Sequence, residues 1–388
     1  MTTDYGTEAI RRHRESRGKV SINSKMTVET LEELSIAYTP GVASVCMAIH
    51  ADPTESYNLT NRGNTIAVVT DGSAVLGLGN IGAEAAMPVM EGKSILFKNL
   101  AGVDAYPICV SSQDPDEIIR TVRAIAPSLG GVNLEDIAAP KCFDIEDALQ
   151  DLGIPVFHDD QHGTAIAVLA AVINGLAVTG RKIEDSSFVF AGAGAGGIAS
   201  AKLLLDYGAT NITLVDSVGI IHRGRNDLTP IKSSMLDTTN PENRTGGIAE
   251  AMRGTDVFIG LAVADMVTPE MVSSMAKDSV VFAMANPVPE IMPDLAEAAG
   301  AAVVGTGRSD FPNQINNSLV FPGVFRGALD AKASRITTSM KLAAGEALAA
   351  LIPEPTPERV IPWSLDRAVS AAVAKACADE WATSGAEG

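Results

Sequence analysis

Short apolar runs and longer helical stretches alternate through the second half of this chain. The apolar run 188–190 leads through a glycine-rich turn into a small-residue stretch over 198–207, and another apolar run follows at 212–215. Short apolar runs are typical of buried strands, whereas the small-residue stretch has the length of a helix. The pattern therefore predicts a strand, a helix and a second strand in one βαβ unit.

The turn inside this unit contains glycines at positions 192, 194 and 197. Gly192 permits a tight turn, Gly194 lets the backbone approach a pyrophosphate, and Gly197 lets the helix lie close to the strand. Asp216 ends the second strand, where an acid can accept a hydrogen bond from a ribose hydroxyl. The unit therefore predicts dinucleotide binding, and the alternative is a glycine-rich turn with a purely structural role.

The alternation continues beyond this unit. Strands are predicted at 257–262, 280–284 and 302–305, and Thr268 with Pro269 starts a helix between the first two. Strands that alternate with helices form a doubly wound parallel sheet. We therefore expect an α/β fold of the Rossmann type in this half of the chain, followed by C-terminal helices.

Two asparagines stand in loops near the ends of these strands. Asn286 lies in the segment ANPVPE, and Asn317 lies in NNSLVFPG. Ligands of doubly wound sheets bind at the carboxyl ends of the strands, so both asparagines are candidate ligand contacts. Asparagine is also a common turn residue, and the residues alone leave both interpretations open.

The first half contains a second glycine pattern, after an apolar run at 65–69. The segment TDGSAVLGLGNIG places glycines at 77, 79 and 82. Pro88 then stands where a crossover helix would need its backbone hydrogen bonds, so we predict that this turn does not bind the dinucleotide. Lys93 follows beside the apolar run 95–97, which we interpret as a strand. Such a lysine is usually solvated, but partial burial would let it act as a base.

Carboxylates follow two predicted strands of the first half. Glu135 and Asp136 come directly after one apolar run, and Asp159 and Asp160 follow another. Carboxylate oxygens at two strand ends suit Mg²⁺ or Mn²⁺, and the alternative is a set of solvated loop acids. Adjacent strand residues point to opposite faces, so Glu135 and Asp136 can share one ion only if the strand has ended or bent there.

Two histidines flank the second acidic pair. His158 and His162 raise the possibility of zinc, but no third soft ligand stands near them in the sequence. We therefore favour a hard divalent cation over zinc at this position.

A helix start is predicted close to the N-terminus. Thr39 can cap the helix, Pro40 fits its first position, and apolar residues at 42, 45, 46 and 49 mark one face. Tyr38 then precedes this helix in a loop. A tyrosine in such a place is commonly a packing residue with a satisfied hydroxyl.

Length and charge limit the classes of protein. With 388 residues, the chain exceeds what one hydrophobic core usually serves, so we expect two domains. We place the boundary near residue 160, with a substrate, metal and catalytic domain over 1–160 and a dinucleotide domain with C-terminal helices over 161–388. The net charge of −18 argues against nucleic acid or an anionic membrane as the main partner.

The four cysteines and the absence of targeting signals indicate the compartment. Cys46, Cys109, Cys142 and Cys377 form no CxxC pair and stand among apolar residues, as buried thiols do. No apolar run reaches the length of a membrane span, and no signal-peptide core is present. We therefore expect a reducing, cytoplasmic setting.

The motifs together resemble a known family. AYTPGVA, TDGSAVLGLGNIG, EGK, NLEDI, VFHDDQHGTA, AGAGAGG, ANP and NNSLVFPG occur in the order seen in malic enzymes, and the short bacterial form is the most similar. The resemblance covers nearly the whole chain. In this family the first glycine motif belongs to the substrate domain, in agreement with the prediction from Pro88.

The resemblance implies roles for particular residues. By similarity, Tyr38 would be the general acid and Lys93 the general base, and the divalent-metal ligands would be Glu135, Asp136 and Asp160. Thr164 and the glycine turn would contact the cofactor, while the substrate and the nicotinamide would meet Asn286 and Asn317. On this basis, the residues expected at the cofactor are Thr164, Gly192, Gly194, Ala195, Gly197, Asp216 and Asn286.

One position departs from the family pattern. Larger relatives have an arginine just before their LGLG that binds a substrate carboxylate, and the matching position here is Ala74. The residue that holds the distal carboxylate is therefore open. The resemblance also implies a homodimer, which the sequence pattern alone does not reveal.

The resemblance implies oxidative decarboxylation of (S)-malate to pyruvate and carbon dioxide, with a dinucleotide as oxidant and Mg²⁺ or Mn²⁺ as cofactor. A metal-independent 2-hydroxy-acid or amino-acid dehydrogenase and a non-catalytic dinucleotide sensor are the alternatives. Asp216 favours NAD because a carboxylate repels a 2′-phosphate, although His222, Arg223 and Arg225 follow and leave NADP possible.

Overall fold

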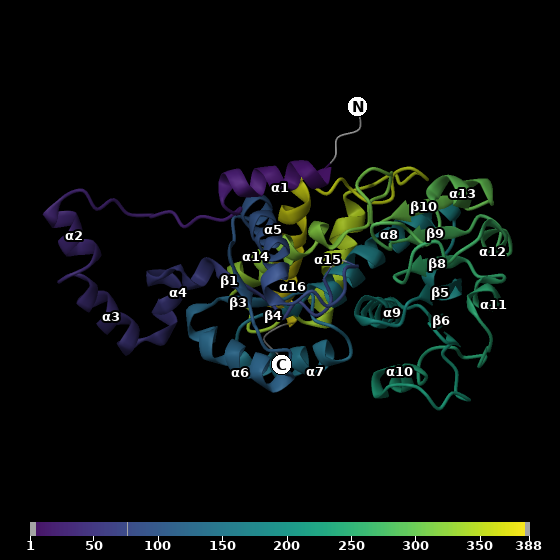
Figure 1. Ribbon diagram of the computed structural model, residues 1–388, viewed down its shortest axis with the longest axis horizontal. Helices are drawn as coiled ribbons and strands as arrows, with labels where there is room; N and C mark the ends of the chain where they lie inside the picture. The colour runs from purple at the N-terminus through teal and green to yellow at the C-terminus, as the bar shows by residue number, and fades with distance from the viewer. Residues whose placement is uncertain (1–4, 76, 385–388) are drawn as a thin grey trace.

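The structure, a computed structural model, describes residues 5–75 and 77–384 and contains two sheets (Figure 1). The first has the strand order β2-β1-β3-β4 and the second β10-β9-β8-β5-β6-β7. The strands are β1 (Thr65–Thr70), β2 (Asp104–Cys109), β3 (Gly131–Leu134), β4 (Val156–His158), β5 (Ser187–Ala191), β6 (Asn211–Asp216), β7 (Gly219–Ile220), β8 (Val257–Gly260), β9 (Val280–Ala283) and β10 (Val303–Thr306).

Helices surround both sheets. They are α1 (Tyr5–Ser16), α2 (Leu31–Ala37), α3 (Val42–Ala51), α4 (Ser56–Leu59), α5 (Ala83–Ala101), α6 (Pro115–Ile125), α7 (Lys141–Ala148), α8 (Thr164–Thr179), α9 (Ala195–Tyr207), α10 (Pro230–Met235), α11 (Ile248–Met252), α12 (Pro269–Ser273), α13 (Pro293–Ala298), α14 (Phe321–Asp330), α15 (Thr338–Ala350) and α16 (Arg367–Ser384). A single π-helical turn, η5 (Asp159–Gly163), precedes α8.

The first sheet is entirely parallel and covered on both faces. Every residue of β1 is buried. Ile66 and Val68 pack into the cluster that includes α5, whereas Ala67 and Val69 pack into a separate cluster with α6 and α7. A strand covered on both sides reads as a continuous apolar run, which is why β1 was predictable from its sequence.

The second sheet confirms the predicted α/β fold. Its strands are parallel except β7, which pairs antiparallel with β6 at one edge. The unit β5, α9 and β6 is the predicted βαβ unit. The chain turns from β6 back to the opposite side of β5, where β8 lies. This reversal creates the crevice in which doubly wound sheets bind their ligands.

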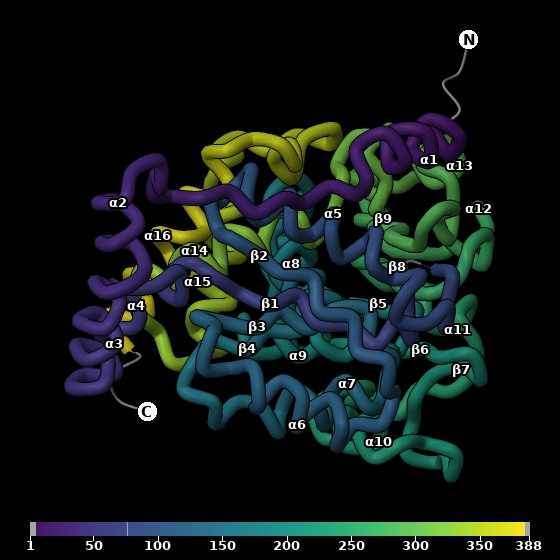
Figure 2. The backbone as a smooth tube through the Cα atoms, turned by 60° about the vertical axis from the view of Figure 1, so that its left-hand side comes forward, coloured from purple at the N-terminus to yellow at the C-terminus, as the bar shows by residue number. Residues whose placement is uncertain are grey.

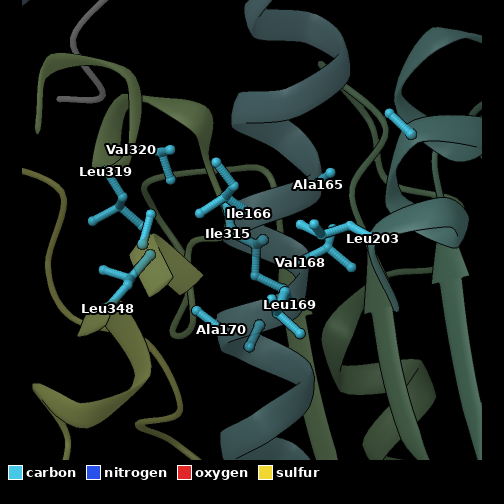
Figure 3. Close-up of a cluster of buried hydrophobic side chains, with 14 of the residues drawn as sticks. Ala165, Ile166, Val168, Leu169, Ala170, Leu203, Ile315, Leu319, Val320 and Leu348 are labelled. Atoms are coloured by element: carbon cyan, nitrogen blue, oxygen red, sulfur yellow. The ribbon is translucent and has the colours of Figure 1, made fainter. Parts of the chain in front are cut away.

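Helix α8 connects the two sheets through a shared core. Figure 3 shows its side chains between Leu203 of α9 and Leu348 of α15, with Ile315 and Leu319 packed nearby. The cluster extends from β1 and α5 of the first sheet to β5 and β8 of the second. A boundary near residue 160 therefore separates the two sheets in sequence, whereas the hydrophobic core runs across it.

The C-terminal helices complete the first half of the molecule. Phe321 and Phe325 of α14 pack on Phe97 of α5, with ring centroids 4.6 and 5.5 Å away. Phe325 also meets Phe157 of β4 edge-on at 5.8 Å. The end of the chain thus supplies aromatic side chains to the core under the first sheet.

The N-terminal arm, residues 20–60, stands away from this core. Figures 1 and 2 both show α2 and α3 outside the main body. Neither helix has a buried residue, and Leu31, Ile36 and Met47 are 82%, 60% and 62% exposed. Such an exposed run of large apolar side chains marks an interaction surface.

By length and composition alone, two continuous stretches of the described residues, Leu31–Ala51 and Asp159–Thr179, match a membrane span, although no apolar run of that length was expected. The second is mostly buried in the shared core. The first consists of α2 and α3, with 7 and 10 residues, separated by a turn. Neither helix approaches the roughly 20 residues that a span requires.

Three local predictions were wrong. Thr39 does not cap α3, which begins at Val42 after Gly41, because residues 38–41 form a turn in which the Gly41 N–H donates to the Ser35 carbonyl. Pro88 lies inside a continuous α5, so the missing N–H did not prevent a helix after the first glycine turn.

The apolar run 95–97 is also part of α5 and not a strand, because a short apolar run does not distinguish a buried helical segment from a strand. The expectation that all four cysteines are buried was also wrong for one of them. Cys46 is exposed on the arm, whereas Cys142 and Cys377 are buried as expected.

Candidate active site

Three carboxylates meet at the carboxyl edge of the first sheet. One oxygen each of Glu135, Asp136 and Asp160 lies within 4.8 Å of the other two, and this is the only such group of His, Cys, Asp or Glu side chains found within residues 5–75 and 77–384. These are the three predicted ligands. Oxygen donors at this spacing fit a hard divalent cation. The group contains no histidine, which argues against zinc.

The bend required at this edge is present. β3 ends at Leu134, and Asp136 has a φ of +55°, which turns the chain out of the strand. A non-glycine residue with positive φ is uncommon and costs conformational energy, so it marks a site constrained by its surroundings. The Asp136 N–H donates to Asp160 Oδ2 at 2.8 Å and joins the two strand ends.

Lys93 lies beside the cluster, on α5 and not beside a strand as predicted. Its Nζ is 3.0 Å from Glu135 Oε1 and 2.5 Å from Asp159 Oδ2, and it lies 4.5 Å from the ring centre of Phe321. It also donates to Asn317 Oδ1 at 3.3 Å. The structure therefore unites Lys93 and Asn317, which are separated by more than half of the chain.

Burial and charge act in opposite directions on these groups. Burial alone would lower the pKa of Lys93, but Asp159, Glu135 and Asp160 outweigh it and raise that pKa. Burial raises the pKa of Glu135 to about 7 and that of Asp160 to about 6, despite the opposing charge of Lys93. The acids therefore hold the lysine in its charged form.

The glycine turn has the geometry expected for a dinucleotide. Gly192 has a φ of +107°, and a Cβ on Gly197 would collide with the Gly192 carbonyl oxygen. Nothing lies within 4 Å of the position of a Cβ on Gly194, so the backbone is open to a ligand there. Ala195 begins α9, so the first free N–H groups of the helix face this opening.

A cleft of about 420 Å³ continues from this turn to the end of β6. Its lining includes Gly192, Gly194, Asp216 and Lys232. Asp216 accepts from Arg225 at 2.8 and 3.1 Å and from Lys232 at 2.6 Å. Burial would raise the pKa of Asp216, but these two cations lower it overall. The acid at the ribose position is therefore neutralised by its neighbours.

The dinucleotide turn touches the metal turn directly. A Cβ on Gly196 would stand 3.1 Å from the Asp160 carbonyl oxygen and 3.4 Å from Cγ2 of Thr164. A side chain at this position would push η5 and α9 apart by a few tenths of an ångström, so glycine favours this close approach. Gly196 was not among the predicted site residues, although its glycine neighbours gave a signal.

Asn286 lies against the first glycine turn. A Cβ on Gly77 would approach the Asn286 carbonyl oxygen to 2.8 Å, and one on Gly307 would meet Asn286 Nδ2 at 2.5 Å. Asn286 Nδ2 donates to the Met284 carbonyl at 3.3 Å. The first glycine turn thus supports the loop that carries a predicted substrate residue.

Ala74 and its neighbours also lie at this edge. The Ala74 N–H donates to the Asp136 carbonyl at 3.0 Å, and Ser73 Oγ accepts from the Ala138 N–H. The position of the family's arginine is therefore adjacent to the metal cluster, but alanine offers no charge there.

Tyr38 is the one predicted catalytic residue that the fold does not bring to Lys93. It lies between α2 and α3 on the N-terminal arm and is 66% exposed. Figure 1 shows these helices far from β3 and β4, where the carboxylates lie. Within one chain, the general acid and the base are separate.

Comparison with known proteins agrees with this arrangement. Residues 16–150 match the model of the malic enzyme N-terminal domain, and residues 161–381 match that of the malic enzyme NAD-binding domain. This chain belongs to the malic enzyme family. The N-terminal match contains Lys93 and two of the three clustered acids, and the second match contains the dinucleotide turn.

Individual malic enzymes are similar over most of their length. The bifunctional malic/malolactic enzyme of Bacillus subtilis (strain 168) is 53% identical over 96% of this chain and 92% of its own. The NAD-dependent malic enzyme of Geobacillus stearothermophilus is 54% identical over 87% of this chain and 70% of its own. The NADP-dependent malic enzyme of Halomonas elongata is 48% identical over 89% and 82%. The relatives therefore include users of both cofactors.

Solved malic enzyme structures share the fold. The NAD-dependent malic enzyme of Thermotoga maritima has a TM-score of 0.93 at 47% identity and covers 95% of this chain and 98% of its own. The malic enzyme of Pyrococcus horikoshii has a TM-score of 0.94 at 45% identity and covers 97% and 91%.

Two residues that contact predicted site residues were not themselves predicted at the site. Asp159 was named only as an acid that follows the second strand, and its pairing with Lys93 was not predicted. Lys232 was not predicted at all, because it follows Asp216 after an irregular stretch without a motif. Of the cations expected near the ribose, Arg223 instead donates to the Leu236 carbonyl.

Proposed function

We propose that this chain oxidises (S)-malate with a dinucleotide and decarboxylates the product to pyruvate and carbon dioxide. One observation carries the proposal: the turn that supplies Asp160 packs directly against Gly196 of the dinucleotide turn. A hydride donor bound at the three-acid cluster would then lie next to a nicotinamide bound at the end of the second sheet. Hydride transfer requires that proximity, and the decarboxylation that follows would take place at the same cluster of acids.

In this proposal, Lys93 removes the C2 hydroxyl proton of malate while the C2 hydride leaves for the nicotinamide. Asn317 holds the lysine from the opposite side, and Phe321 keeps water away from it. Lys93 must be neutral to accept this proton, whereas its acidic neighbours favour the charged form.

The residues of the cluster fit a divalent cation, Mg²⁺ or Mn²⁺, held by Glu135, Asp136 and Asp160. Such an ion would supply Lewis acidity toward the C2 oxygen and would offset the negative charge that keeps Lys93 protonated. Asp159 stays with Lys93 and does not join this set. The cluster also distinguishes the proposal from a metal-independent dehydrogenase and from a dinucleotide sensor, because neither needs three clustered acids.

We also propose that Tyr38 protonates C3 after carbon dioxide has left, and that it does so in a homodimer. The arm that carries it exposes Leu31, Ile36 and Met47, so burial against a second copy would remove apolar surface from water. A C2 dimer would place both arms symmetrically, and each Tyr38 would serve the site of the partner.

For the oxidant we propose NAD, as Asp216 suggests, with NADP as a possible substitute. Arg225 and Lys232 neutralise that carboxylate, so its repulsion of a 2′-phosphate is weaker than the sequence implied. The preference for NAD or NADP therefore depends on two competing interactions. The ribose hydroxyl of NAD would bind Asp216, whereas the 2′-phosphate of NADP would bind Arg225 and Lys232.

The deciding experiment combines malate, Mn²⁺ and each dinucleotide with the purified chain. We expect reduced nicotinamide and pyruvate in equal amounts, and no product after removal of the metal with a chelator. Product that persists in chelator would favour the metal-independent dehydrogenase, and binding of dinucleotide without turnover would favour the sensor.

A further inference from the structure

A buried carboxylate outside the metal cluster binds the turn that carries two of the site acids. Glu146 of α7 accepts from the His158 backbone N–H at 3.2 Å, from Gln161 Nε2 at 3.0 Å and from His162 Nε2 at 2.8 Å. These three donors belong to residues 158–162, which form the end of β4 and most of η5. The Glu146 carboxylate thus accepts hydrogen bonds from three residues of one turn.

The turn itself is unusual. η5 is a π-helical turn, a rare form that occurs mainly at functional sites. Its first residue, Asp159, pairs with Lys93, and its second, Asp160, reaches the metal cluster. A regular α-turn would rotate these two side chains relative to each other. The π geometry therefore decides which acid meets the lysine and which meets the cation.

A chain of contacts extends from this turn to the C-terminal helices. Lys341 of α15 is 3.1 Å from His162 Nδ1. Because an ammonium group only donates, Nδ1 accepts and Nε2 carries the proton that points at Glu146. His162 is thereby fixed as one tautomer between a cation and an anion. Burial would raise the pKa of Glu146, but His162 and Lys341 hold it at about 2.

We propose that Glu146 is a positioning residue for the metal site, because its carboxylate fixes the 158–162 turn and so presents Asp160 to the cation and Asp159 to Lys93. This inference rests on the metal site proposed above. Among the described residues, Glu146 forms its hydrogen bonds with the 158–162 turn and none with Lys93 or the clustered carboxylates. It acts only through the backbone and side chains of the turn.

The test is the affinity for Mn²⁺, measured by electron paramagnetic resonance of the free ion, without malate or dinucleotide. Glu146→Gln keeps the size of the side chain but replaces one acceptor oxygen with an NH₂ group that faces an N–H donor, so at least one hydrogen bond is lost. We expect the dissociation constant for Mn²⁺ to rise about 10- to 100-fold, the usual effect of losing a residue that orients a metal ligand.

Glu290→Gln is the matched control. Glu290 is also buried and accepts from the Ala262 and Ala285 N–H groups at 2.8 and 3.0 Å, but it lies in the loop between β9 and α13, beside the second sheet. Its substitution should lower thermal stability and leave Mn²⁺ affinity within about twofold of wild type. If the affinity for Mn²⁺ falls equally in both variants, Glu146 has only a general stabilising role, and the proposal is overturned.

A second variant covers the case in which Glu146→Gln does not fold. Gln161→Met removes one donor to Glu146 and keeps the carboxylate ionised, so we expect a smaller, several-fold loss of Mn²⁺ affinity. Wild-type affinity in Gln161→Met, or in a folded Glu146→Gln, overturns the positioning role while the metal site stands. A wild-type chain that does not bind Mn²⁺ would overturn the metal site and this inference together.

Discussion

The metal site and the N-terminal arm both carry residues proposed for one reaction, but they are built in opposite ways. Lys93 and three of the acids around it are buried, and the partners of these groups lie within the same chain. On the arm, Tyr38 is exposed between two helices without a single buried residue. A buried charge is costly unless an opposite charge or a hydrogen-bond partner lies next to it. An exposed apolar helix can instead bury its side chains against another molecule.

The two regions therefore differ in the steps of the proposed reaction that a single chain can carry out. The first steps, removal of a proton and a hydride, need only groups that one chain assembles. In the proposed mechanism, the last step, protonation of C3, needs Tyr38, which one chain leaves in solvent. Variants that separate these two requirements therefore test the comparison.

The largest effect is expected for Lys93→Ala. Removal of the base should lower kcat by about 10²- to 10⁴-fold and should stop hydride transfer itself, so no burst of reduced nicotinamide forms in a single turnover. Lys98→Ala is the matched control, because Lys98 lies on the same helix, is mostly exposed and pairs with Asp104. If both variants lose the burst, the role of Lys93 is wrong.

The next effect concerns Tyr38. Tyr38→Phe should bind pyruvate normally but should nearly abolish exchange of its C3 hydrogens with deuterated solvent, a loss of about 10²-fold or more. Exchange at the wild-type rate would make the tyrosine a packing residue.

Mixed dimers sharpen this prediction. Lys93→Ala and Tyr38→Phe are each inactive, but a dimer with one copy of each contains one intact site if Tyr38 acts in the partner. Random pairing should then restore about a quarter of wild-type activity. If Tyr38 acts within its own chain, the mixture stays inactive, and the contrast between the two regions disappears.

A smaller effect separates the two adjacent acids of η5. Asp160→Asn should weaken Mn²⁺ binding about tenfold or more, because it removes a ligand oxygen. Asp159→Asn should leave Mn²⁺ affinity nearly unchanged, because its carboxylate faces Lys93. A titration that finds equal losses would show that Asp159 belongs to the metal set.

The smallest effect is expected at the ribose end of the cleft. Lys232→Ala should raise the KM for NADP by roughly tenfold, the value of one charged hydrogen bond to a partly exposed phosphate. The KM for NAD should change little, because Arg225 still holds Asp216. A clear preference of the wild type for NADP would overturn the choice of NAD.

Local pattern was enough for much of the fold. The unit of β5, α9 and β6 was predictable because strand, glycine turn and helix follow one another within 30 residues. Thr268 was predictable as the start of a helix for the same reason, and its side chain accepts from the Met271 N–H of α12. Each of these features depends on near neighbours in the sequence.

The parts that failed depend on distant neighbours. Pro88 was taken to weaken a helix, yet the packing of α5 under the first sheet outweighs one missing hydrogen bond. The pairing of Asp159 with Lys93 was not predicted, because nothing local in the sequence places Lys93 beside it. The exposure of Tyr38 could not be predicted from the sequence. The hydrophobic pattern of a helix is the same whether the helix packs on its own chain or on another.

The aromatic contacts of α14 also constrain how the chain is made. Synthesis proceeds from the N-terminus, so Phe97 and Phe157 leave the ribosome long before Phe321 and Phe325. Until those late residues emerge, the underside of the first sheet stays open to water and to other nascent chains. Chaperones that bind apolar surface should therefore capture stalled chains ending before residue 320 and release chains that extend past α14.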